Sequence, residues 1–178
     1  MERSAFKTEE LAYIALGAAL ITVCAWITVP LTVPFTMQIF AVFLSLILLG
    51  GRNGTIAVAV YILLGAIGIP VFSGGKGGFS VLIGPTGGYL WGMLLIGGVY
   101  WIGTMLFQRK LWIETALLAL GLLMCYAFGT VWFSALNPEK GFAASLLVCV
   151  VPFLLPDSVK LALALVFGRK LRRILSMQ

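Results

Sequence analysis

Long apolar runs, broken by short stretches of Gly, Pro and basic residues, dominate the whole chain. A helix that crosses a bilayer needs about 20 mainly apolar residues, and most of these runs approach that length. The pattern predicts six membrane-spanning helices. Their approximate ranges are 11–29, 36–49, 55–69, 85–107, 112–133 and 143–167. We therefore expect an all-α integral membrane protein.

The second and third segments are shorter than a normal span. The second ends at Gly50-Gly51-Arg52-Asn53, and the third ends at Pro70, where a long Gly-rich stretch begins. Short, interrupted segments beside Gly-rich loops are typical of binding regions in transporters. We expect this part of the chain to contribute to a ligand site.

The overall composition fits one membrane domain over residues 1–178. Of these residues 61% are hydrophobic and only 10% are charged, and the mean hydropathy is +1.10. A soluble domain has about 25% charged residues. The sequence lacks a GxxxxGK[ST] phosphate-binding loop, so the chain is not expected to hydrolyse ATP by that route. Active transport would then draw on an ion gradient or on other subunits.

The basic residues are distributed unevenly between the two sides of the predicted bundle. Nine fall on the side that carries both termini, two on the other side and one within a span. This positive-inside bias predicts that both termini are cytoplasmic, and it gives the net charge of +6 an explanation other than nucleic acid. The nine are Arg3, Lys7, Arg52, Arg109, Lys110, Arg169, Lys170, Arg172 and Arg173.

The residue types that most often carry catalysis or bind metals are scarce. The chain has no His, and Cys24, Cys125 and Cys149 lie in apolar stretches without CxxC spacing. We interpret the cysteines as small buried hydrophobic residues. The sequence therefore predicts no catalytic residues, no metal site and no enzyme. The enzymatic alternative would use Asp157 and Lys160 as acid and base.

Asp157 and Lys160 stand inside the last apolar run. An unpaired Asp or Lys in the middle of a membrane helix costs about 2.5–3.5 kcal/mol on insertion scales. The i,i+3 spacing places both side chains on one helical face, where they can pair. We interpret the pair as part of a ligand or transport site. The alternative is a structural salt bridge that locks one helix to its neighbour.

Three weaker signals each leave two interpretations open. The Gly-rich stretch 70–89 predicts a cover over a ligand or a flexible connector, and its aromatic residues favour the cover. Gln38 suits a neutral polar ligand group or an interhelical hydrogen bond. Ala15 and Ala19 form a small-xxx-small surface that allows close helix packing, either within the bundle or against a partner subunit.

Four separated motifs, in this order, resemble one family over nearly the whole chain: BioY, the biotin-specific substrate-binding S-component of energy-coupling factor (ECF) transporters. The region from 90 to 155 adds little beyond hydrophobicity. The motifs are Val33-Pro34-Phe35-Thr36-Met37-Gln38, Tyr61 with Gly65, Gly68 and Pro70-Val71-Phe72, Gly84-Pro85-Thr86-Gly87-Gly88-Tyr89, and Pro156-Asp157 with Lys160.

The resemblance implies an S-component-like bundle of six helices in a prokaryotic plasma membrane, with cytoplasmic termini. It implies a biotin pocket open to the outside, a transmembrane coupling subunit and two ATPase subunits as partners, and no cofactor. Ala15 and Ala19 match an Ala-x-x-x-Ala motif that contacts the coupling subunit in related proteins. Asp157 and Lys160 match a pair associated with biotin recognition.

On this resemblance we expect the ion pair to bind the ureido head of biotin. A carboxylate accepts hydrogen bonds and suits the ureido N–H groups, whereas Lys160 donates and suits the ureido oxygen, the valerate or Asp157 itself. Aromatic side chains would pack against the bicycle, and glycines would approach the ligand through their backbone. The expected ligand-binding residues are Asp157, Lys160, Gln38, Phe35, Phe72, Gly74, Gly75, Gly77 and Tyr89.

The predicted function is thus the capture of biotin outside the cell and its delivery inward with ECF partners. Two alternatives stay within vitamin uptake: a solitary biotin transporter that works without ATPase partners, and an S-component for another vitamin. A purely structural role would leave the buried charges and the Gly-rich stretch unexplained.

Overall fold

The computed structural model describes residues 7–30 and 33–175, so Arg3 of the charge count lies outside the described residues. Apart from one two-residue strand pair and the turns, the described chain is helical. Its elements are α1 (Thr8–Trp26), β1 (Thr28–Val29), β2 (Phe35–Thr36), α2 (Gln38–Ala66), η1 (Ser73–Gly75), α3 (Phe79–Ile83), α4 (Gly87–Leu106), α5 (Leu111–Leu136), η2 (Pro138–Lys140), α6 (Gly141–Cys149) and α7 (Val151–Leu175).

Five helical stretches of the described chain are long and apolar enough to cross a membrane. They are α1, α2, α4, α5 and the stretch from Gly141 to Ile174, which joins α6 to α7. The predicted class of an all-helical membrane protein is therefore confirmed.

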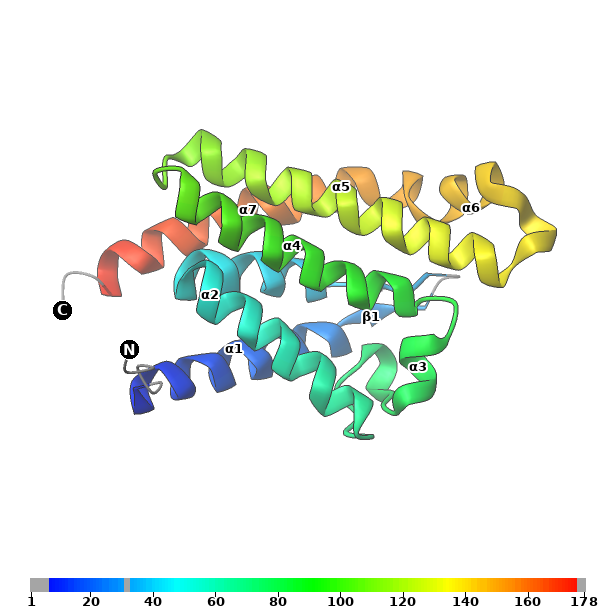
Figure 1. The fold of residues 1–178 in the computed structure, drawn as a ribbon, viewed down its shortest axis with the longest axis horizontal. Helices are drawn as coiled ribbons and strands as arrows, with labels where there is room; N and C mark the ends of the chain where they lie inside the picture. The colour runs from blue at the N-terminus through cyan, green and yellow to red at the C-terminus, as the bar shows by residue number, and fades with distance from the viewer. Residues whose placement is uncertain (1–6, 31–32, 176–178) are drawn as a thin grey trace.

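The chain reverses direction inside α2, at Gly50 (Figure 1). Gly50 has φ 84° and ψ 169°, a backbone conformation that is essentially restricted to glycine. Gln38 Nε2 lies 3.0 Å from the Tyr61 hydroxyl, although a straight helix would separate the two residues by about 35 Å. α2 thus consists of two antiparallel arms, 38–49 and 51–66. The predicted break in helix between 49 and 55 was wrong, because Gly50 is the only non-helical residue there and the helix resumes at 51.

Two further predicted boundaries were also wrong. The first predicted segment extends to 29, but α1 ends at Trp26, and Thr28 and Val29 pair with Thr36 and Phe35 in a short antiparallel ladder. Pro30 favours this extended conformation, because the residue before a proline is pushed out of the helical region. At the other end of the chain, α7 continues to Leu175, where basic side chains in its last turn complement the helix dipole.

The bundle has two distinct ends (Figure 1). The start of α1 and the end of α7 lie at one end, which we call the terminal end. The strand pair, α3 and the connection from α5 to α6 lie at the opposite end, which we call the loop end. The segments with expected ligand residues all converge on the loop end.

Two glycines bring α4 and α5 unusually close together. A Cβ atom on Gly92 would lie 2.6 Å from Cys125 Sγ, and one on Gly121 would lie 2.8 Å from Ile96 Cα. Real Cβ atoms do not approach other heavy atoms this closely, so neither position has room for a side chain. The close contact turns Tyr89 of α4 and Tyr126 of α5 toward the same interior space at the loop end.

Candidate ligand-binding site

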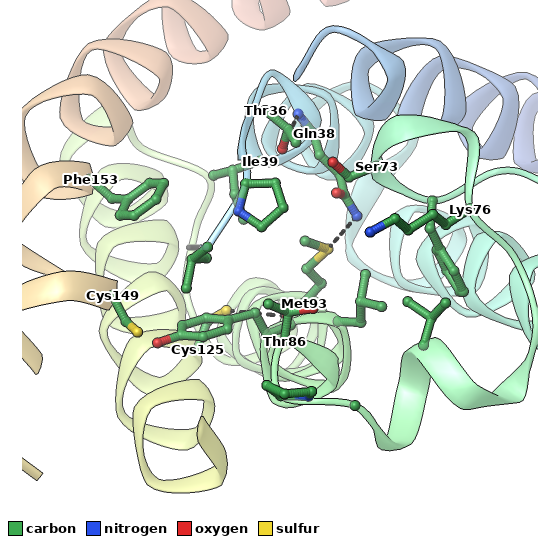
Figure 2. A pocket seen from close by; sticks show the side chains of 18 of the residues that line it. Thr36, Gln38, Ile39, Ser73, Lys76, Thr86, Met93, Cys125, Cys149 and Phe153 are labelled. Carbon is green, nitrogen blue, oxygen red and sulfur yellow. Dashed lines mark hydrogen bonds between the residues drawn. The ribbon is translucent and has the colours of Figure 1, made fainter. Parts of the chain in front are cut away.

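A cavity of about 310 Å³ lies at the loop end, bounded by the start of α2, the Gly-rich segment, α4, α5, α6 and α7. Figure 2 shows Phe153 and Cys149 on one side and Ser73 and Lys76 on the opposite side. The lining is mainly apolar with a few polar groups, which is typical of small-molecule sites of about 300–1,000 Å³. The cavity is therefore suited to a small, largely apolar ligand that carries a few polar groups.

Asp157 and Lys160 line this cavity and bind each other directly. Lys160 Nζ donates to Asp157 Oδ1 at 2.7 Å and to the backbone oxygen of Thr36, also at 2.7 Å. The two residues are only 2% and 4% exposed. The pair thus joins α7 to the segment before α2, and each member keeps hydrogen-bonding capacity toward the cavity, since a carboxylate accepts about four hydrogen bonds.

Tyr126 completes this polar cluster, although we did not predict it. Its hydroxyl donates to Asp157 Oδ2 at 2.6 Å, from a position 31 residues earlier in the chain. The hydroxyl oxygen can still accept one hydrogen bond from a ligand. In the sequence Tyr126 is one tyrosine in the apolar run of α5, and the only available signal was a polar atom at mid-span.

Phe35 supports the cluster from the side and is not among the residues that line the cavity. The Lys160 ammonium lies 4.0 Å from the centre of its ring, a cation–π distance. The ring also stacks on Phe153, with 6.3 Å between centroids, and Phe153 does line the cavity. In this arrangement Phe35 holds Lys160 and Phe153 in place.

Gln38 lies on the cavity wall at the first turn of α2 (Figure 2). Its side-chain nitrogen donates to the Tyr61 hydroxyl at 3.0 Å and to Met93 Sδ at 3.1 Å. These contacts bridge the two arms of α2 to α4. Both sequence interpretations apply, since the same amide makes interhelical hydrogen bonds and faces the cavity.

The Gly-rich segment is more ordered than either sequence interpretation assumed, since it contains η1 and α3. Phe72 lines the cavity, is 1% exposed and packs edge-on against Tyr61. Gly74, Gly75 and Gly77 do not line the cavity, whereas their neighbours Ser73 and Lys76 do. The glycines shape the backbone that presents these two side chains.

Tyr89 lines the cavity from α4, and its hydroxyl forms a 3.1 Å hydrogen bond with the Thr130 hydroxyl. Cys125 and Cys149 also line the cavity, and both are buried. Among the described residues, no group of three or more His, Cys, Asp or Glu side chains is placed to hold a metal ion.

Ala15 and Ala19 lie far from this site, on α1. Both are exposed, whereas Ile14, Gly17 and Ala18 of the same helix are buried. The small-xxx-small surface therefore faces outward and is not used for packing within the bundle.

Comparisons with known proteins agree with this picture. The model of the BioY family matches residues 1–177. A protein of Thermotoga maritima named biotin transporter BioY is 44% identical over 88% of this chain and 91% of its own length. A probable biotin transporter BioY of Pyrococcus horikoshii is 36% identical over 93% of this chain and 98% of its own length.

A solved structure has the same fold. It is described as the S-component for biotin from an ECF-type ABC transporter, and it superimposes with a TM-score of 0.80. Its sequence is 28% identical, and the match covers 95% of each chain.

Proposed function

The chain belongs to the BioY family, and on this premise we propose that it binds biotin outside the cell and delivers it inward as the substrate-binding component of an ECF transporter. BioY proteins are transporters, so the prediction that the chain is not an enzyme is confirmed. Membrane location follows from the family and from the apolar helices.

The observation that carries this proposal is the buried cluster of Asp157, Lys160 and Tyr126 on the cavity wall. The ureido ring of biotin offers two N–H donors and one oxygen acceptor. Asp157 Oδ2 and the Tyr126 oxygen can accept from the N–H groups, and the Lys160 ammonium can donate to the oxygen. Because the cluster is buried, these hydrogen bonds would form at a low local dielectric.

Apolar side chains around the cluster match the rest of the ligand. Phe153, Phe72, Met93 and Leu90 line the cavity and suit the bicycle with its thioether. Tyr89 would close the same surface from α4. Gln38, whose nitrogen is already bonded, would offer its amide oxygen as an acceptor.

The membrane topology is also a proposal. We assign six crossings to a single membrane domain by counting the two arms of α2 separately, with both termini in the cytoplasm. The Gly50 reversal, the position of the described chain ends at one end of the bundle and the nine-to-two distribution of basic residues support this assignment. The loop end and its cavity would then face outward, with the Gly-rich segment as the cover.

Partner engagement rests on the outward-facing small residues of α1. Ala15 and Ala19 allow a helix of another subunit to approach closely. We propose that a transmembrane coupling subunit binds there and that two ATPase subunits supply energy, without any cofactor in this chain. The alternative is a solitary biotin transporter, which uptake assays in proteoliposomes with and without the partners would distinguish.

Equilibrium binding of biotin to the purified chain in detergent tests the proposal, with the vitamins riboflavin and thiamine as controls. We expect saturable binding of one biotin per chain and no binding of the other two. If the folded protein does not bind biotin but binds another vitamin, the chain is instead an S-component of different specificity.

A further inference from the structure

Three charged side chains line the cavity among the described residues: Asp157, Lys160 and Lys76. The first two neutralise each other at 2.7 Å. Lys76 makes no ion pair with any other described residue, so the described lining of the cavity carries one net positive charge. Biotin itself has an uncharged bicyclic head and, at neutral pH, a negatively charged carboxylate at the end of a flexible chain.

The backbone of the Gly-rich segment holds Lys76 at a defined place. Phe72 N donates to Lys76 O at 2.9 Å, and the two residues form an isolated antiparallel bridge. The turn between them requires positive φ at Gly74 (71°) and Gly75 (70°), values at which other residues are strained. A Cβ at Gly77 would lie 2.4 Å from the Ile69 oxygen. The glycines thus allow the backbone to turn tightly between Phe72 and Lys76, which fixes the position of Lys76.

Lys76 and the ion pair approach the cavity from different sides. Figure 2 shows the Lys76 side chain directed inward from the side opposite Phe153, and Phe153 is one helical turn before Asp157 on α7. The cavity therefore has a neutral polar cluster at one wall and a single cation at another, with apolar side chains between them.

We propose that Lys76 binds the carboxylate of the ligand and thereby makes the site selective for the free acid over uncharged derivatives. This inference rests on the proposed function, because it takes biotin as the ligand. It assigns the two polar ends of biotin to two walls: the ureido head to Asp157, Lys160 and Tyr126, and the valerate to Lys76.

Lys160 is a poorer partner for the carboxylate. Its ammonium already donates to Asp157 and to the Thr36 oxygen and lies over the Phe35 ring. A ligand carboxylate at Lys160 would also lie beside the Asp157 carboxylate, and the two like charges would repel. Apart from Asp157, no acidic side chain lines the described part of the cavity, so Lys76 offers the ligand carboxylate a cation without this repulsion.

The test compares biotin with biotin methyl ester by calorimetric titration of the detergent-solubilised protein. We expect wild type to bind biotin about fivefold to tenfold more tightly than the ester, since Lys76 is exposed and its contact is partly screened. Lys76→Gln should bind both ligands equally, at the level of the ester, and Lys76→Glu should prefer the ester. Raising the salt concentration should weaken the preference of wild type.

Lys110→Gln is the matched control, because it removes the same charge from an exposed position at the terminal end. This variant should keep the full preference. The inference is overturned if Lys76→Gln retains the preference or weakens both ligands by the same factor. It is also overturned, with the proposed function intact, if wild type binds biotin and its ester equally; a folded wild type that binds neither overturns both.

Discussion

Two carboxylates are buried in the part of the chain that the structure describes, one at each end of the bundle, and their hydrogen-bond partners are very different. Asp157 at the loop end receives one ammonium and one hydroxyl. Glu114 at the terminal end is 0% exposed and receives three guanidinium groups and one hydroxyl. The three guanidinium groups belong to Arg109, Arg169 and Arg172, at 3.0, 2.8 and 2.9 Å.

The Glu114 cluster is a structural tie between distant segments. Arg169 and Arg172 come from α7, and Arg109 from the connection between α4 and α5. Arg109 also donates to the backbone oxygen of Ile47 at 2.9 Å, which fixes the end of the first arm of α2 just before the Gly50 reversal. Glu114 is not among the residues that line the cavity at the loop end.

The difference shows that burial of a charge does not by itself indicate a ligand site. A carboxylate whose acceptor positions are taken by several cations holds helices together. A carboxylate with one cation, spare acceptor positions and a cavity in front of it is available to a ligand. Substitutions that exchange single polar atoms at the two ends test this distinction.

Glu114→Gln should have the largest effect, and on stability alone. Removing a buried charge from its partners costs about 3–5 kcal/mol, and here three arginines lose their counter-ion. We expect a much lower thermal unfolding temperature in detergent, while the folded fraction keeps its affinity for biotin.

Glu139→Gln is the control for Glu114→Gln, because Glu139 is exposed in η2. It should leave the unfolding temperature unchanged. A folded Glu114→Gln protein that no longer binds biotin would mean that the terminal end takes part in ligand binding after all.

Asp157→Asn should have the next largest effect, and chiefly on binding. Removing the charge of one partner of a buried, hydrogen-bonded charge pair costs about 2–5 kcal/mol, so we expect biotin affinity to fall by at least about 30-fold. Titration calorimetry measures the change, and Ser158→Ala on the exposed face of the same helix is the control. Undiminished affinity would make the Asp157 pair a structural tie like that of Glu114.

Tyr126→Phe should have the smallest effect of the three. It removes one hydrogen bond to Asp157 and one acceptor for the ligand but leaves the ion pair in place. A hydrogen bond to a charged group is worth about 1.5–3 kcal/mol, so a loss of about tenfold in biotin affinity is expected from the same titration. Tyr13→Phe, exposed on α1, should show no change.

Much of the fold could be predicted because helices that cross a membrane are recognisable as long apolar runs in the sequence. The apolar runs located the helices, and their breaks at glycine and basic residues located the turns. The sequence did not show that one residue suffices to reverse the chain at Gly50, since the required φ of 84° leaves no mark beyond the glycine itself. The sequence also did not show that α7 continues to Leu175, because the basic residues that follow an apolar run end the membrane span but do not end the helix.

The site could be predicted where a charged residue stands in an apolar run, because burying an unpaired charge in a membrane costs free energy. Asp157 and Lys160 stand out in an apolar run, and the structure brings them to one cavity with Gln38, Phe72 and Tyr89. Tyr126 and Lys76 were missed because a tyrosine in a membrane helix and a lysine in a Gly-rich loop are both ordinary. Glu114 was missed because its partners Arg169 and Arg172 lie 55 and 58 residues away.

The reversal at Gly50 also bears on how the protein is assembled. A short arm of about a dozen residues is a poor membrane helix by itself, but a one-residue turn joins the two arms with almost no loss of loop-closure entropy. The Gln38 amide can therefore donate its hydrogen bond to the Tyr61 hydroxyl within a single helical hairpin. One cavity wall thus depends on contacts within this hairpin alone, whereas the charges that complete the site come from α7, about a hundred residues further along the chain.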